Sequence, residues 1–114
     1  PTGEVKNLAG QFVAPSIDAV TAAAAGALAT VPEDLRYSIT NPPGDRAWPI
    51  SGTTWALVYQ DMPAGAERKG LVGFLRWVLT DGQSLCAPLD YAPLPKELAA
   101  RALKKLDSVE LATK

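Results

Sequence analysis

The sequence contains no histidine and a single cysteine, Cys86, among its 114 residues. A disulfide within the chain is therefore impossible, and neither a zinc site nor acid–base catalysis by histidine is expected. Because no histidine can activate Cys86, we expect a buried structural thiol and not a nucleophile. No run of about 18 apolar residues is present, so no transmembrane helix is predicted. We predict no catalytic residue, no metal and no cofactor.

The chain also lacks a strong excess of charge of either sign. Its 11 basic and 12 acidic side chains give a net charge of −1. Proteins that bind nucleic acid or an anionic membrane present a basic surface, so neither partner is predicted. The acidic residues Asp18, Asp90 and Glu97 show no paired spacing suited to acid–base chemistry, and the sequence does not predict an enzyme.

The composition is that of one small globular domain, with 47% hydrophobic and 20% charged residues. We predict an α/β fold with about three strands and three main helices. Sheets more often have roughly four to six strands, so the predicted sheet is incomplete. An incomplete sheet exposes an edge that a partner chain or another copy can cover.

Residues 48–60 are the predicted crossover strand, which connects the α/β unit before it to the two helices after it. Residues 53–59 are rich in β-branched and aromatic side chains, which fit a pleated surface. Residues 56–58 are apolar at every position, which favours a strand buried on both faces. Pro49 and Gly52 mark where the strand can begin.

Residues 1–47 are predicted to form one short α/β unit. An extended segment ends at Pro15, and Ser16 then N-caps an alanine-rich helix. Gly26 within that helix costs about 1 kcal/mol relative to alanine, so we expect a close backbone approach at this position. Residues 35–39 alternate apolar and polar side chains, which indicates a second strand.

Residues 61–114 are predicted to form two helices. The first covers residues 66–86, and its apolar pattern weakens near Gly82, where we expect a bend or an end. Pro95 suits the first turn of the second helix because its missing N–H is not needed there. The apolar stripe of that helix consists of Leu98, Ala102, Leu106 and Val109.

Three tryptophans have two interpretations. Trp48, Trp55 and Trp77 can form a stacking platform for a sugar or a base. Core packing is favoured, because Trp55 lies in the predicted strand and Trp77 lies in the apolar helix.

Four sequence blocks occur in a characteristic order: NLAGQFVAPS at residues 7–16, YSITNPPG at 37–44 with AWPISGTTW at 47–55, KGLVGFLRWVLTDGQ at 69–83, and LDYAPLP at 89–95. Together they resemble the C-terminal part of the periplasmic phosphate-binding protein of bacterial phosphate ABC transporters. The resemblance covers nearly the whole chain. It identifies residues 1–114 as a C-terminal segment of that family.

The resemblance implies a two-lobed type II periplasmic binding protein that closes on inorganic phosphate without catalysis and delivers it to the membrane subunits of the transporter. This chain would form part of one lobe, completed by a complementary N-terminal chain or by oligomerisation. The resemblance also implies a periplasmic or extracellular location. We find no signal peptide, and the start at Pro1 indicates a piece of a longer precursor.

In such proteins the anion is held by backbone N–H groups at helix N-termini, by hydroxyls, by an arginine and by an aspartate. The segments that carry those ligands precede the part that this chain matches, so none is transferred to it. The candidates within this chain are Ser51, Thr53 and Thr54, at the start of the predicted strand. Their hydroxyls can bind an anion, or they can satisfy backbone groups at the crossover.

Three further candidates also have ordinary structural alternatives. Arg36 and Arg46 can clamp a phosphate, but their neighbours Asp34 and Asp45 favour surface ion pairs. Ser16 can present helix amides to an anion, although a simple cap is favoured.

A second functional hypothesis belongs to a different class. The chain can be a stand-alone structural or interaction module that does not bind phosphate and associates through its open sheet edge. If another chain supplies the upstream half of the family's protein, the phosphate-binding hypothesis holds. If nothing supplies it, the stand-alone module is favoured.

Overall fold

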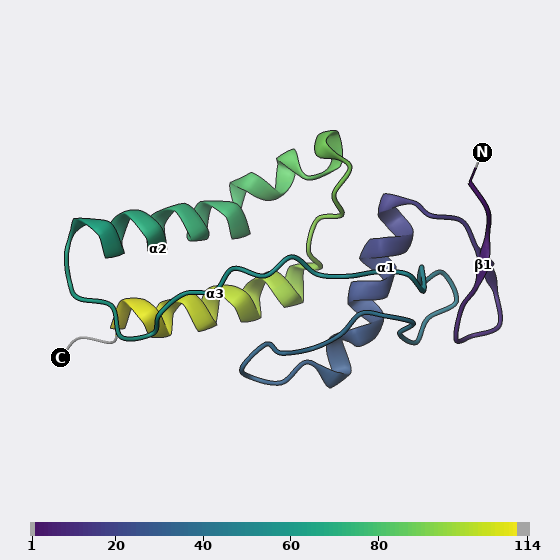
Figure 1. Cartoon of the computed structure of the whole chain (residues 1–114), viewed down its shortest axis with the longest axis horizontal. Coiled ribbons are helices and arrows are strands. Elements are labelled where there is room, and N and C mark those ends of the chain that lie inside the picture. Colours follow the sequence, from purple (N-terminus) through teal and green to yellow (C-terminus); the bar gives the residue numbers. More distant parts are fainter. Residues whose placement is uncertain (1, 112–114) are drawn as a thin grey trace.

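The computed structural model describes residues 2–111, and the side chains of residues 2–109. Pro1, from which the precursor is inferred, and residues 112–114 of the predicted last segment lie outside the described residues. The molecule is elongated, with extents of 51 × 29 × 18 Å. Figure 1 shows its elements: β1 (Val5–Lys6), β2 (Phe12–Val13), α1 (Ile17–Ala27), α2 (Ala66–Leu79) and α3 (Lys96–Leu111), with 3-10 turns η1 (Leu28–Thr30), η2 (Asp81–Leu85) and η3 (Ala87–Leu89).

The start of α1 and the role of its glycine are confirmed. The hydroxyl of Ser16 accepts a hydrogen bond from the Ala19 N–H at 3.1 Å, which satisfies one of the free amides of the first turn. Gly26 faces the backbone of Pro43, and a Cβ at this position would collide with the Pro43 carbonyl oxygen. The glycine therefore permits the loop after residue 40 to lie directly on α1.

An antiparallel hairpin of two-residue strands precedes α1, with Val5 opposite Val13. The buried side chain of Asn7 attaches this hairpin to residues 44–47. Its carboxamide oxygen accepts from the Gln11 N–H at 3.0 Å. Its nitrogen lies 2.9–3.2 Å from three carbonyl oxygens of the loop, those of Gly44, Asp45 and Ala47.

Helices α2 and α3 pack against each other in opposite directions (Figure 1). Val72 of α2 is buried against Leu106 and Val109 of α3, and Arg76 binds Asp107 at 2.8 Å across the pair. The predicted stripe on α3 is confirmed, since its three larger members are buried and Ala102 is half-buried. The α-helix predicted for residues 66–86 ends at Leu79, just before Gly82, and continues only as 3-10 turns.

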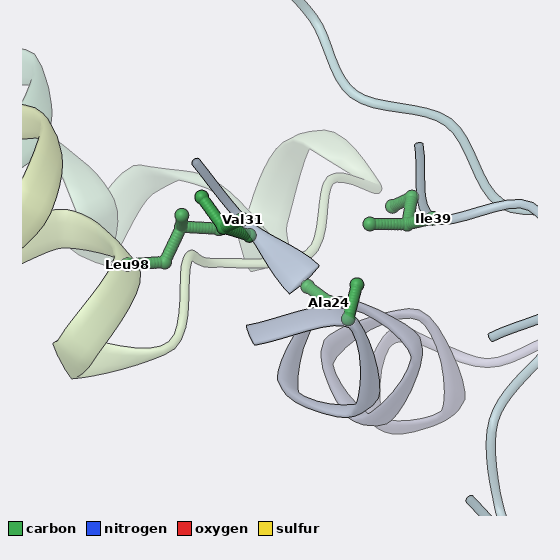
Figure 2. Close-up of a cluster of buried hydrophobic side chains, with 5 residues drawn as sticks. Ala24, Val31, Ile39 and Leu98 are labelled. Carbon is green, nitrogen blue, oxygen red and sulfur yellow. The ribbon is translucent and has the colours of Figure 1, made fainter. Parts of the chain in front are cut away.

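The core consists of two small clusters. One lies between α1, the segment after it and the start of α3, and its buried members are Ala24, Ala27, Val31, Ile39 and Leu98 (Figure 2). The other is the α2–α3 cluster around Val72. Arg101 of α3 connects them by donating to the carbonyl oxygens of Leu28 at 3.2 Å and Val31 at 3.1 Å. No large side chain among the described residues is completely buried.

The two longer predicted strands are not formed. Neither residues 35–39 nor the crossover strand within residues 48–60 belongs to the sheet, which contains only β1 and β2. Residues 35–39 retain the predicted alternation of burial, but Leu35 has a left-handed backbone with φ of 60°. A strand requires a hydrogen-bonded neighbour, and these segments find none within residues 2–111. The structure is thus mainly helical with a small sheet, compatible with a fragment of an α/β fold.

The predicted core positions of two tryptophans are wrong for this structure. Trp55 is 48% exposed and Trp77 is 44% exposed. Trp77 stacks on Phe74 with ring centroids 6.1 Å apart, on a face of α2 that remains accessible. Cys86, expected to be buried, is half-buried. Trp77 stays accessible because α2 packs on α3 from one side only and no other described element covers its opposite side. Trp55 lies in the segment before α2, and no described layer covers it.

Candidate functional site

The candidate site lies at the start of the segment that connects the α1 region to α2. Two backbone hydrogen bonds fix this start. The Trp48 N–H donates to the Ala19 carbonyl at 3.0 Å, and the Asn41 N–H donates to the Pro49 carbonyl at 2.8 Å. Asn41 has a left-handed backbone with φ of 46°, a conformation that asparagine tolerates well. The crossover therefore begins from a fixed position on α1.

Ser51 is buried, and its polar groups are used within the protein. Its hydroxyl donates to the Trp48 carbonyl at 2.7 Å. Its own carbonyl accepts from the Thr40 hydroxyl at 3.3 Å. This geometry matches the structural alternative, in which the serine satisfies backbone groups at the crossover.

Thr53 is half-buried and Thr54 is exposed. Within residues 2–111, neither hydroxyl makes a hydrogen bond, and no hydrogen bond joins either of them to Ser51. A serine or threonine hydroxyl has one proton to donate. The proton of Ser51 is engaged, whereas those of the two threonines are available to a ligand.

The two candidate arginines lie on the surface. Arg36 is exposed, and its Nε lies 3.7 Å from a carboxylate oxygen of Asp34, as the surface interpretation predicted. Such exposed pairs contribute little to stability. The expected pair between Arg46 and Asp45 is absent from the described part of the chain, and both residues are exposed. No contact among the described residues joins either arginine to the candidate hydroxyls of Ser51, Thr53 and Thr54.

Sequence reasoning missed one surface feature. Tyr37 and Trp55 meet edge to face, with ring centroids 5.1 Å apart. A shallow, open groove is lined by these two residues together with Arg36, Ser38 and Leu57. The sequence feature that could have indicated this groove is the strand-favouring composition of residues 35–39 and 53–59. That composition instead favoured burial of Trp55.

Among residues 2–109, whose side chains the structure describes, no group of three acidic or cysteine side chains could bind a metal ion. No described helix combines the length and the apolar character needed to cross a bilayer. The part of the chain that the structure describes thus offers hydroxyls, backbone amides and aromatic rings for recognition.

Comparison with known proteins agrees with the family resemblance. The chain is 37% identical over 94 residues to the phosphate-binding protein PstS of Xylella fastidiosa strain 9a5c, covering 82% of this chain and 26% of that protein. It is 33% identical to the phosphate-binding protein PstS of Pasteurella multocida, with 82% and 27% covered. It is 31% identical to that of Methanocaldococcus jannaschii, with 96% and 31% covered. No protein-family model matches the chain.

These similarities confirm that the chain resembles the C-terminal part of phosphate-binding proteins. The chain spans about a quarter to a third of the length of the curated relatives it matches.

Proposed function

We propose that this chain, a relative of the PstS phosphate-binding proteins, is the C-terminal part of a solute-binding protein that captures inorganic phosphate for an ABC importer. The observation that carries the proposal is the similarity to PstS proteins of different organisms over 82–96% of the chain. The proposed role is binding without catalysis. By the same resemblance, the site of action is the periplasm or the cell exterior.

Within this proposal the chain contributes part of a type II lobe and the crossover to it. The candidate phosphate contacts are Ser51, Thr53 and Thr54. A phosphate needs hydrogen-bond donors, and the free hydroxyl protons belong to Thr53 and Thr54, while Ser51 holds the backbone that positions them. The remaining donors come from polypeptide outside these 114 residues.

The proposed partners follow from the same relationship. They are phosphate, the polypeptide that corresponds to the rest of the relatives, and the membrane subunits of the transporter. The alternative, a stand-alone module that associates through an open edge and does not bind phosphate, explains the exposed apolar side chains but not the similarity to proteins named for phosphate binding.

Isothermal calorimetry tests this proposal. Phosphate is titrated into the chain alone, and into the chain co-expressed with the part of the Xylella fastidiosa PstS protein that lies outside the match. We expect no binding by the chain alone and one phosphate per complex, with sulfate as the control anion. Absence of phosphate binding by the complex would overturn the proposal, and tight binding by the chain alone would show that the other donors are not needed.

A further inference from the structure

The contacts within the chain divide it into two parts, which we call the α1 unit and the helical pair. The α1 unit is residues 2–51, where the Trp48 N–H donates to the Ala19 carbonyl and holds the following loop on α1. The helical pair is α2 with α3, joined through the cluster around Val72. The segment between the two parts adds little restraint, because no backbone–backbone hydrogen bond joins residues 52–61 to any other described residue.

The change from one part to the other occurs within two residues. The ring of Trp55 contacts Tyr37 of the α1 unit, whereas Val58 packs against the helical pair. Ala56 and Leu57 lie between these contacts, and both are exposed. Hinges consist of a few such residues in a loop or at the end of an element. The two parts can therefore rotate about this joint unless a second connection holds them.

The start of α3 supplies the second connection. Figure 1 shows this end of the helical pair next to α1. Leu98 is 2% exposed and enters the cluster beside α1 (Figure 2), and Leu94 packs against the same cluster. The Pro93 carbonyl accepts a hydrogen bond from the Thr21 hydroxyl of α1 at 3.4 Å. We call residues 93–101, which carry these contacts, the clasp.

Arg101 is the charged member of the clasp. Its guanidinium donates to the carbonyl oxygens of Leu28 at 3.2 Å and Val31 at 3.1 Å, just beyond the C-terminal end of α1. A positive charge is favourable at that end of a helix, and α1 has no basic residue in its own last turn. Arg101 therefore supplies from another helix the charge that α1 lacks.

The clasp is small enough to open without unfolding either part. It contains one buried leucine, one half-buried leucine and three hydrogen bonds to the α1 unit, and the side chain of Arg101 is 38% exposed. Each part keeps a hydrophobic cluster of its own when the clasp is open. Two conformations related in this way differ by a free energy that leaves the minor one populated at about 0.1–10%.

We propose that the clasp fixes the α1 unit relative to the helical pair, and that Arg101 thereby sets the affinity for phosphate without touching the anion. The link to phosphate rests on the proposed function, in which the hydroxyls of Thr53 and Thr54 act together with donors from other polypeptide. Such donors hold one anion only while their relative positions are fixed, so only molecules with a closed clasp bind. Arg101 is a positioning residue in this arrangement.

Distances between two spin labels test the clasp in the chain alone. The labels are attached at Asp45→Cys in the α1 unit and Lys69→Cys in α2, which are exposed positions, and Cys86→Ser removes the native thiol. We expect one main distance, with an open-to-closed ratio of at most about 1:10. Loss of the charged hydrogen bonds in Arg101→Met is expected to raise this ratio at least about tenfold. An unchanged distance distribution in Arg101→Met overturns the proposal.

Matched variants separate the clasp from general destabilisation. Glu97→Gln removes a partner of Arg101 within α3 and leaves the bonds to the α1 unit, so its distances are expected to match those of the wild-type chain. Leu94→Ala shortens an apolar side chain of the clasp and is expected to favour the open form, while Leu89→Ala at an exposed leucine is not. Circular dichroism selects the temperature at which all variants are folded. Equal distances in Leu94→Ala and Leu89→Ala overturn the proposal even if Arg101→Met does not fold.

Calorimetry of the complex with the remainder of the Xylella fastidiosa protein tests the link to phosphate. The dissociation constant rises as the closed fraction falls, so a ratio moved from about 1:10 to 1:1 predicts a roughly twofold rise for Arg101→Met. The double variant with Leu94→Ala is expected to show a larger rise, and saturating phosphate is expected to reverse the shift in label distances. An unchanged dissociation constant in a double variant with shifted distances overturns the effect on affinity. A wild-type complex that does not bind phosphate overturns the proposed function, while the label distances still decide whether the clasp exists.

Discussion

The indole of Trp55 lies edge-on to the ring of Tyr37, with ring centroids 5.1 Å apart and an interplanar angle of 65°. This contact joins the two segments that the sequence predicted as strands, although no backbone hydrogen bond connects residues 35–39 with 53–59. A side-chain contact, and not backbone hydrogen bonding, therefore holds these two segments next to each other.

The first prediction concerns this aromatic pair. An edge-to-face pair contributes about 0.5–1.5 kcal/mol beyond its buried area. Because half of Trp55 is exposed, we expect Trp55→Ala to lower the free energy of unfolding of this chain by about 1–2 kcal/mol, less than the 3–5 of a buried aromatic. Urea unfolding of Trp55→Ala, Tyr37→Ala and the double variant measures the coupling. A loss above 3 kcal/mol would place Trp55 in a core.

The second prediction concerns two helical glycines. At Gly26 an added Cβ meets the Pro43 carbonyl, so Gly26→Ala is expected to destabilise the chain by about 1–3 kcal/mol despite the better helix propensity of alanine. Gly73 lies within α2, and no described atom outside the backbone of that helix comes within 4 Å of an added Cβ, so Gly73→Ala is expected to stabilise by about 0.5–1 kcal/mol. Thermal unfolding of both variants checks the opposite signs. The same sign at both positions would contradict the close approach at Gly26.

The third prediction concerns the carboxamide of Asn7. Asn7→Asp replaces the donor that faces three loop carbonyls with an acceptor, so their hydrogen bonds are lost and like partial charges meet. A buried group left unpaired costs about 1–3 kcal/mol, and we expect a loss of that size in urea unfolding. Gln11→Ala is the control, because Asn7 bonds only to the backbone N–H and the backbone carbonyl of that exposed residue. Equal stability of the wild-type chain and Asn7→Asp would show that the hairpin is not attached through this side chain.

The fourth prediction concerns Arg101, which donates to two carbonyl groups beyond α1 and to Glu97 at 2.6 Å. Arg101→Met leaves the carbonyls of Leu28 and Val31 without this partner, and we expect it to cost about 1–2 kcal/mol. Glu97→Gln removes only an exposed ion pair and is expected to cost no more than about 0.5 kcal/mol. Denaturant unfolding at low and high salt compares the free energies of unfolding of Arg101→Met and Glu97→Gln. A larger loss for Glu97→Gln would reverse this assignment.

The fifth prediction separates the three candidate hydroxyls. Ser51→Ala leaves the Trp48 carbonyl without its partner, so we expect a loss of stability of about 1 kcal/mol. Thr53→Val and Thr54→Val remove hydroxyls that bond to no described residue, so stability is retained while phosphate affinity of the complex falls. Calorimetry and thermal unfolding of the same samples make the distinction. Unchanged affinity in both threonine variants would remove them from the site.

The sequence predicted the local features correctly where neighbouring residues decide the outcome. The Ser16 cap, the close approach at Gly26 and the apolar stripe of α3 all depend on contacts within a helix or directly against it. The strand at residues 53–59 depends instead on hydrogen bonds to a neighbour, which β-type composition cannot supply. The same reason explains Trp55: its side chain suits a core, but no layer among the described residues covers it.

The candidate site was predictable only in part. The sequence placed Ser51, Thr53 and Thr54 together at the crossover. It did not indicate that Ser51 alone would be tied to the Trp48 carbonyl, because that bond depends on the turn that the two residues form. The role of Asn7 was equally hidden, since its partners are three backbone carbonyls far along the chain.

Helix α3 belongs to both cores: Leu98 lies in the cluster beside α1, and Leu106 lies in the cluster beside α2. The two positions are separated by about 12 Å of helix at 1.5 Å per residue. Cooperativity of unfolding between the two ends of this elongated molecule is therefore transmitted through roughly two turns of one helix. A break in those turns would turn one melting transition into two, each with the small enthalpy of a half-sized core.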